Sequence, residues 1–265
     1  MRRAAYVSLG TLAARFLTAL SGLIIARAVG PASFGVYAAV WALVELSTSM
    51  TEIGLITGLK REGGHHPERI PFLLGNTLVV RSAAGMALLL GAALLRGVLV
   101  RNPDAARIFV PLGLTALSII GAESLFAVLQ VEARQRAVAT LVAGRAFIFF
   151  LGVIALAWSK ADIVAFAWCQ GGVYVGTALI TAVYVRITMP ISLRLTHVPR
   201  QVHGAMAFAI SEILYSVYLS LPLLCLSRLG TEEAVGWFAV AQRFVTLGVA
   251  IGIAATHEAF LPALF

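Results

Sequence analysis

Four arginines stand inside long apolar segments, where a charged side chain is costly. On membrane-insertion scales an arginine at mid-membrane costs about 2.5–3.5 kcal/mol, so such a residue tends to face the protein interior or a water-filled cavity. A guanidinium group pairs bidentately with phosphate oxygens, which suits it to bind an anionic substrate group. The candidate substrate-binding residues are Arg15, Arg81, Arg145 and Arg243.

Glutamates are as numerous in the same segments, and they allow a different interpretation of the arginines. Fixed ion pairs that hold helices together would occupy every guanidinium group and leave none for a substrate. The glutamates concerned are Glu45, Glu52, Glu123, Glu212 and Glu258. Their depths along the segments are compatible with the pairs Glu123–Arg145, Arg15–Glu52 and Arg81–Glu45.

A glutamate that stays unpaired within a membrane could instead carry a proton or a cation for coupling. Glu45 is the best candidate because it lies deepest in its segment. The candidate ion-coupling residues are Glu45, Glu52 and Glu123.

Polar residues recur at helical spacing in three of the segments. Residues three and four positions apart share one face of a helix, so each set predicts a polar stripe. Three stripes in one half of the chain suggest that this half surrounds a hydrated cavity. The stripes are Ser8, Thr11, Arg15, Thr18 and Ser21; Tyr37, Trp41, Glu45, Thr48 and Glu52; and Gln170, Tyr174, Thr177, Thr181 and Tyr184.

The chemistry of an enzyme is absent from these segments. There is no Ser-His pair, no interfacial pair of acids and no aspartate-rich motif, and the two aspartates, Asp104 and Asp162, fall in short loops. His65 and His66 have no clustered cysteine or aspartate, which is typical of a solvated loop rather than a metal site. We therefore expect no catalytic residues, no metal and no cofactor. The sequence contains no ATP-binding motif, so an ion gradient or the substrate gradient would supply the energy.

The amino-acid composition indicates which secondary-structure elements carry these arginines and glutamates. Of 265 residues, 60% are hydrophobic and 12% charged, about half the charge of a soluble domain. The apolar runs are continuous and about 20 residues or longer, which predicts transmembrane helices rather than barrel strands. We predict an all-α integral membrane protein of about eight spans. These are roughly 6–29, 35–58, 72–95, 108–131, 138–158, 163–186, 205–228 and 236–261.

The formal charge of +8 favours basic cytoplasmic loops over nucleic-acid binding in such a protein. The Lys and Arg near span ends favour a cytoplasmic N-terminus, although this orientation places the basic loop with Arg96, Arg101 and Arg107 on the outer side of the membrane. We expect a multi-pass protein of the cell membrane, whose obligatory partner is the lipid bilayer.

An internal repeat divides the chain. Arg27-Ala-Val-Gly30, a short turn, Gly35 and Tyr37 recur about 200 residues later as Arg228-Leu-Gly230, a short turn, Gly236 and Phe238. This order fits a parallel repeat of about six helices, although glycine turns before apolar runs also arise by chance. It predicts a six-helix lobe (1–187), a basic cytoplasmic linker (188–204) and two helices of an incomplete second lobe (205–265).

The same motifs carry a family resemblance over essentially the whole chain. Arg27-Ala-Val-Gly-Pro-Ala-Ser-Phe-Gly-Val-Tyr, followed by Glu52-Ile-Gly54-Leu, resembles the start of Wzx-type polysaccharide and oligosaccharide flippases. Their superfamily, the MOP exporters, includes MurJ-type lipid flippases and MATE antiporters. The stretch 226–244 resembles the start of their second lobe. Phe260-Leu-Pro262 resembles a proline-containing pattern that is common at the end of the helix in this stretch. Such proteins usually have 12 to 14 helices, so the chain resembles a truncated member.

The resemblance implies two helical lobes around a central cavity, and alternating access for a lipid-linked sugar. MurJ-type flippases have an arginine in their first helix, and Arg15 is the matching residue by position. It also implies work alongside polysaccharide-synthesis enzymes. We expect a flippase for a polyprenyl-pyrophosphate-linked oligosaccharide, moving it from the inner to the outer leaflet. The alternatives are a MATE-like antiporter of small molecules or cations, and a non-transporting remnant.

Overall fold

The structure is a computed structural model that describes residues 2–52, 54–100, 102, 104–189, 191–192 and 198–260. Within these ranges, side chains are not described for residues 2–9, 96–99, 198–209, 212, 247 and 250–260. Residues 190 and 193–197 of the predicted linker and Pro262 therefore lie outside the described residues, as do the side chains of 198–204, Glu212 and Glu258.

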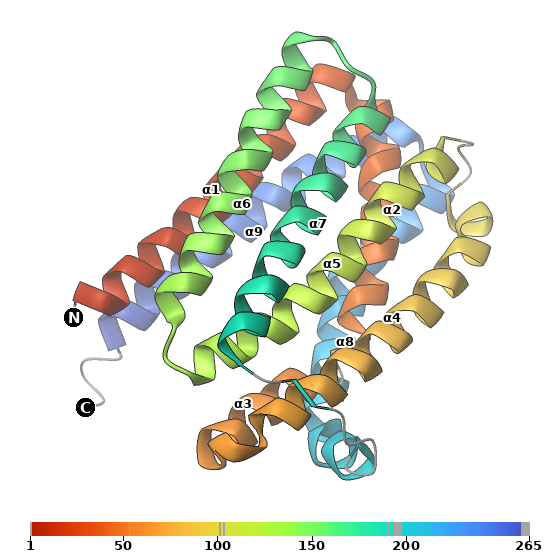
Figure 1. The fold of residues 1–265 in the computed structure, drawn as a ribbon. Coiled ribbons are helices and arrows are strands. Elements are labelled where there is room, and N and C mark those ends of the chain that lie inside the picture. Colours follow the sequence, from red (N-terminus) through yellow and green to blue (C-terminus); the bar gives the residue numbers. More distant parts are fainter. Residues whose placement is uncertain are drawn as a thin grey trace.

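The described residues form an all-α bundle of long helices (Figure 1), as the sequence predicted. A short 3-10 turn, Pro67–Arg69, joins two of the helices. The helices are α1 (Arg2–Val29), α2 (Pro31–Ser49), α3 (Leu55–His65), α4 (Ile70–Leu99), α5 (Ala105–Val131), α6 (Gln135–Trp158), α7 (Ile163–Thr188), α8 (Val198–Leu229) and α9 (Glu232–Phe260).

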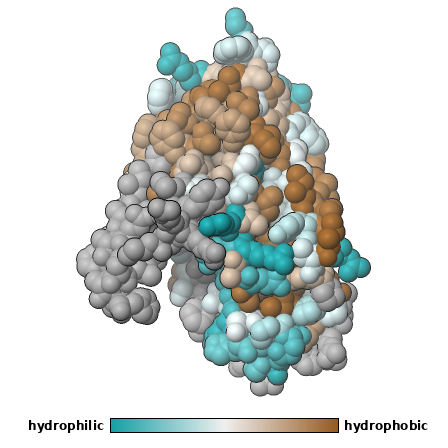
Figure 2. Space-filling model, turned by 60° about the vertical axis from the view of Figure 1, so that its left-hand side comes forward, coloured by the Kyte–Doolittle hydropathy of each residue, from teal (hydrophilic) through white to brown (hydrophobic). Residues whose placement is uncertain are grey.

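Five segments of the described chain are long and apolar enough to cross a membrane, and they fall in α1, α4, α5, α6 and α7. The apolar part of α8, Ile213–Leu229, is shorter. Large apolar side chains lie on the outside of the bundle, among them Leu94, which is 85% exposed, and Trp158, which is 86% exposed. Figure 2 shows apolar side chains over the upper flank of one face and hydrophilic ones gathered nearer its lower end. Lipid rather than water is the medium in which such a surface is stable.

The second predicted span, 35–58, is wrong as a single helix. Helix α2 ends at Ser49, and a turn precedes α3, where Gly54 has φ of 62°. Hydroxyl groups near the break bond to backbone carbonyls, as in Thr51 Oγ1 to Thr48 O at 2.7 Å. Glycine tolerates the left-handed region, and hydroxyl side chains compete with helical hydrogen bonds. The remainder of the predicted span, α3, is amphipathic and buries Leu59 while exposing Lys60.

Helix α2 lies at the centre of the bundle and packs against α1, α4, α5, α8 and α9. Its buried residues join those of α5, α7 and α9 in the larger of two apolar clusters, with Phe34 and Phe166 fully buried. The smaller cluster joins α3, α4 and α5 to the lower ends of α6 and α7. These two clusters fix the positions of the polar side chains described next.

Candidate functional site

A polar cluster lies between α2, α7 and α9. Tyr37 of α2 donates a short hydrogen bond from its hydroxyl to Gln170 Oε1 of α7. The Arg243 guanidinium of α9 lies over the Phe34 ring, with Cζ 5.3 Å from the ring centroid. Tyr37, Glu45 and Tyr174 are all within electrostatic range of Arg243. The cluster thus brings together polar side chains from three helices that are far apart in the sequence.

Arg145 joins this cluster from α6 through Tyr174. Its guanidinium carbon lies 4.2 Å from the centroid of the Tyr174 ring, which is close for a cation–π contact. Tyr174 is therefore in contact with Arg145 and within electrostatic range of Arg243. Among the described residues, no carboxylate lies within 4 Å of either guanidinium, so neither arginine is held in an ion pair.

Glu45 is exposed and Arg243 is half-buried. Trp41, one turn earlier than Glu45 on the same helix, lies within interaction range of the Glu45 carboxylate. A glutamate so placed adds negative charge to a cluster that otherwise carries an excess of positive charge.

Gly22 on α1 makes room for Arg243. A Cβ atom at position 22 would overlap the guanidinium group, so the arginine head rests directly on the α1 backbone. The missing side chain is therefore part of the site. No pattern in the sequence marks this glycine, because its neighbouring residues do not indicate which helix will cross α1.

Arg15 lies exposed on α1, and among the described residues it has no hydrogen bond or ion pair. It precedes Gly22 by two turns, so both residues lie on the same face of the helix, about 10 Å apart along its axis. Helices α1 and α6 run side by side in the same direction (Figure 1), and Gly10 faces Ala139 at their contact. Arg15 and Arg145 stand five and six residues beyond that contact, hence at similar depth.

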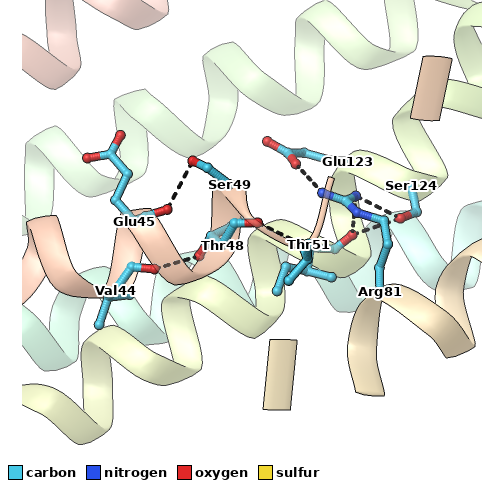
Figure 3. A network of polar contacts seen from close by, with 9 residues as sticks. Val44, Glu45, Thr48, Ser49, Thr51, Arg81, Glu123 and Ser124 are labelled. Carbon is cyan, nitrogen blue, oxygen red and sulfur yellow. Dashed lines mark hydrogen bonds and ion pairs between the residues drawn. The ribbon is translucent and has the colours of Figure 1, made fainter. Parts of the chain in front are cut away.

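Arg81 does not join the cluster. It is 1% exposed and lies against α5, where it donates to Glu123 Oε2 at 3.1 Å, Ser124 Oγ at 3.0 Å and the Ile120 carbonyl at 3.1 Å. Figure 3 shows the Glu45 carboxylate pointing away from this network. The pairs considered from sequence depth, Arg81–Glu45 and Glu123–Arg145, are therefore wrong, and the pair that forms is Arg81–Glu123.

The rotation of α4 and α5 about their own axes, rather than the depth of the residues along the helices, decides which glutamate pairs with Arg81. Ser124 and the Ile120 carbonyl are one turn apart on α5 and face α4, so they meet a guanidinium that arrives from that helix. Among the buried side-chain nitrogen and oxygen atoms of the described residues, Arg81 Nε is the one without a hydrogen-bond partner. With three N–H hydrogen bonds, one of them the ion pair with Glu123, Arg81 acts as a link between α4 and α5. Glu52 also has a polar or electrostatic partner.

The hydroxyl groups of the three predicted stripes mostly bond within their own helices. Thr18 bonds to Ala14 O, Thr48 to Val44 O and Thr181 to Thr177 O, each at 2.8–2.9 Å. Such bonds satisfy the hydroxyls without a cavity. The side chains that connect two stripes are Tyr37 and Gln170, which sequence reasoning placed in the stripes without assigning them a role.

Over residues 1–265 the chain matches the family of polysaccharide biosynthesis proteins. It belongs to that family. This is the family of Wzx-type flippases, whose members are transporters, so the chain is a multi-pass membrane protein with a transport role in polysaccharide synthesis. Neither the curated proteins nor the solved structures contain a significant match to it. The described residues contain no group of three or more His, Cys, Asp or Glu side chains placed to hold a metal ion.

Proposed function

We propose that this protein moves a polyprenyl-pyrophosphate-linked oligosaccharide from the inner to the outer leaflet of the cell membrane. The observation that carries the proposal is a pair of arginines, Arg145 in contact with Tyr174 and Arg243 within electrostatic range of the same tyrosine. Arg145 and Arg243 have no carboxylate within 4 Å among the described residues, so their N–H groups are available to an anionic ligand. A pyrophosphate group bridges two guanidinium groups well, since each can pair bidentately with its oxygens.

Arg15 extends the same positive surface along α1, and its accessible side chain suits a ligand that travels along the bundle. We assign substrate binding to Arg15, Arg145 and Arg243, and a linking role between helices to Arg81. Translocation by alternating access would require the two proposed lobes (1–187 and 205–265, joined by 188–204) to change their relative positions. In this scheme the N-terminus is cytoplasmic, and the protein supplies no catalytic chemistry.

Glu45 is the proposed ion-coupling residue, because it lies beside Arg243 without a strong partner of its own other than Trp41. Protonation of its carboxylate would strengthen the hold of Arg243 on an anion. Glu52 and Glu123 are weaker candidates, since both have other partners. Glu45→Gln should leave transport active but independent of an imposed proton or sodium gradient. If the variant still responds to the gradient, Glu45 is not the coupling site.

The test of the proposed function is reconstitution of the full chain in proteoliposomes with a fluorescent polyprenyl-pyrophosphate-linked oligosaccharide. Quenching from outside measures how much of the label has crossed the bilayer. Flipping above that of protein-free liposomes supports the proposal. A MATE-like antiporter is the second candidate, because Glu45 lies within the cluster; in that case the lipid would not flip and a small cation would exchange for protons or sodium.

A further inference from the structure

The α6–α7 pair carries a second arginine–tyrosine contact at its lower end. The guanidinium carbon of Arg134 lies 5.9 Å from the centroid of the Tyr184 ring, and Arg134 Nη1 donates to the Tyr184 hydroxyl at 3.4 Å. The same two helices carry the Arg145–Tyr174 contact nearer their middle. An arginine thus contacts a tyrosine of α7 at two levels of the bundle, Arg145 from within α6 and Arg134 from the residue that precedes α6.

The spacing of the two contacts is similar on both helices. Arg134 precedes Arg145 by eleven residues, and Tyr184 follows Tyr174 by ten. At about 1.5 Å per residue, both intervals correspond to roughly 15–16 Å, or half of a hydrocarbon core of about 30 Å. If Arg145 lies at mid-membrane, Arg134 lies at the membrane boundary.

The turn before α6 holds Arg134 in place. Ala133 adopts φ of 58°, and the Arg134 amide donates to the Leu129 carbonyl at 2.8 Å. A left-handed conformation is unfavourable for a residue with a Cβ, so the neighbouring structure must impose it. Glu132 pairs with Arg134 Nε at 3.2 Å, while Nη2 has no hydrogen-bond partner among the described residues. The guanidinium is therefore oriented, and part of its donor edge is available.

We infer that Arg134 and Tyr184 form a loading site that binds the pyrophosphate of the lipid-linked substrate before it reaches Arg145 and Tyr174. The inference rests on the proposed function. The available N–H edge of Arg134 offers phosphate a charge-assisted hydrogen bond, and the contacts with Tyr184 and Glu132 orient the guanidinium group. Arg186 is exposed two residues beyond Tyr184 and adds positive charge at this end of the bundle.

The test compares Arg134→Gln with Arg136→Gln in the full chain, with flipping of the fluorescent polyprenyl-pyrophosphate-linked oligosaccharide as the readout. Arg136 is a matched control, because it is exposed two residues further on and has no ion pair or ring contact among the described residues. Loss of a loading site should raise KM roughly five- to tenfold and leave the maximal rate within about twofold. Arg136→Gln should behave as the wild type. Tyr184→Leu, which removes the ring, should resemble Arg134→Gln.

Equal KM values for Arg134→Gln and Arg136→Gln would overturn the inference while leaving the proposed function intact. Failure of the wild-type protein to flip the lipid would remove both. The assay is repeated in neutral and in anionic phospholipid bilayers. If the difference between the two variants vanishes once anionic phospholipid is added, the site binds phospholipid headgroups instead, and the inference is wrong.

Discussion

Gly35 of α2 and Gly236 of α9 each lie against the first turn of the other's helix. A Cβ at Gly35 would overlap the Glu232 carbonyl oxygen, and a Cβ at Gly236 would overlap the Pro31 carbonyl oxygen. Glu232 follows Pro31 by the same sequence interval that separates the two glycines. The contact is therefore symmetric: each copy of the repeated motif places its glycine against the first-turn carbonyl of the other copy. This reciprocity supports the proposal of two like lobes, with α2 and α9 as corresponding helices.

Alanine at either position should destabilise the protein. The obstructing atoms belong to the backbone, so no side-chain rotation relieves the overlap, and overpacking of this kind typically costs about 1–3 kcal/mol. Gly35→Ala and Gly236→Ala should lower the midpoint of thermal unfolding in detergent. Gly248→Ala is the control, because Gly248 lies on the same helix as Gly236 and a Cβ at position 248 would meet nothing within 4 Å. If Gly35→Ala unfolds at the same temperature as Gly248→Ala, the close crossing of α2 and α9 is wrong.

Gly22→Ala should reduce transport with little loss of stability. The added methyl group meets the end of a flexible arginine, so Arg243 moves aside and leaves the cluster while the helices stay packed. The control is Gly10→Ala on the same helix, where the new Cβ would lie 3.6 Å from Ala139 Cβ, an ordinary contact. Flipping rate and unfolding temperature, measured together, distinguish the two effects. A Gly22→Ala protein with an unchanged rate would show that Arg243 does not act from its present position.

Arg81→Met should act on stability and not on substrate binding. The change removes three hydrogen bonds from a side chain that is 1% exposed, and it leaves Glu123, 44% exposed, without its partner. Breaking a fully buried pair costs about 3–5 kcal/mol, and the exposure of Glu123 reduces that figure to about 1–3 kcal/mol. The unfolding midpoint should fall while KM of the remaining folded protein stays the same. A raised KM at unchanged stability would place Arg81 in the substrate site instead.

The proposed orientation predicts which loops react with a membrane-impermeant thiol reagent. With Cys169 and Cys225 replaced by alanine, a cysteine at Lys160 should be labelled in intact cells, because the α6–α7 turn faces outward. A cysteine at Arg61 should be labelled only after the cells are opened. The reverse pattern would invert the topology and the proposed direction of transport.

Hydropathy predicted the long helices well because a continuous apolar run leaves little choice of element. The spans predicted at 108–131 and 163–186 correspond to α5 and α7 within a few residues. The break after Ser49 escaped prediction because serine, threonine and one glycine change hydropathy only slightly while they end a helix. A hydropathy profile follows burial in lipid, and the local hydrogen bonds that stop a helix are invisible to it.

The candidate site was predictable in its residue types but not in its pairings. Depth along the membrane normal allowed Glu123 to meet either Arg81 or Arg145, and the rotation of α4 and α5 decides for Arg81. Tyr174 carried a helical-spacing signal, yet its contact with Arg145 and its proximity to Arg243 depend on how α6, α7 and α9 meet. Gly22 had no signal, because the need for a missing side chain arises only from the packing of Arg243.

The most direct test of the account is substrate binding by Arg145→Gln and Arg243→Gln, each compared with Arg107→Gln. Arg107 is an exposed arginine in the first turn of α5, paired with Asp104 at 3.6 Å, and serves as the control for lost charge. Binding of a polyprenyl pyrophosphate to the full chain in nanodiscs is measured by calorimetry. The account predicts that each cluster variant loses about tenfold or more in affinity, as expected for a charge-assisted contact, while Arg107→Gln binds like the wild type. Equal affinity in all three variants would contradict the claim that these two arginines hold the substrate.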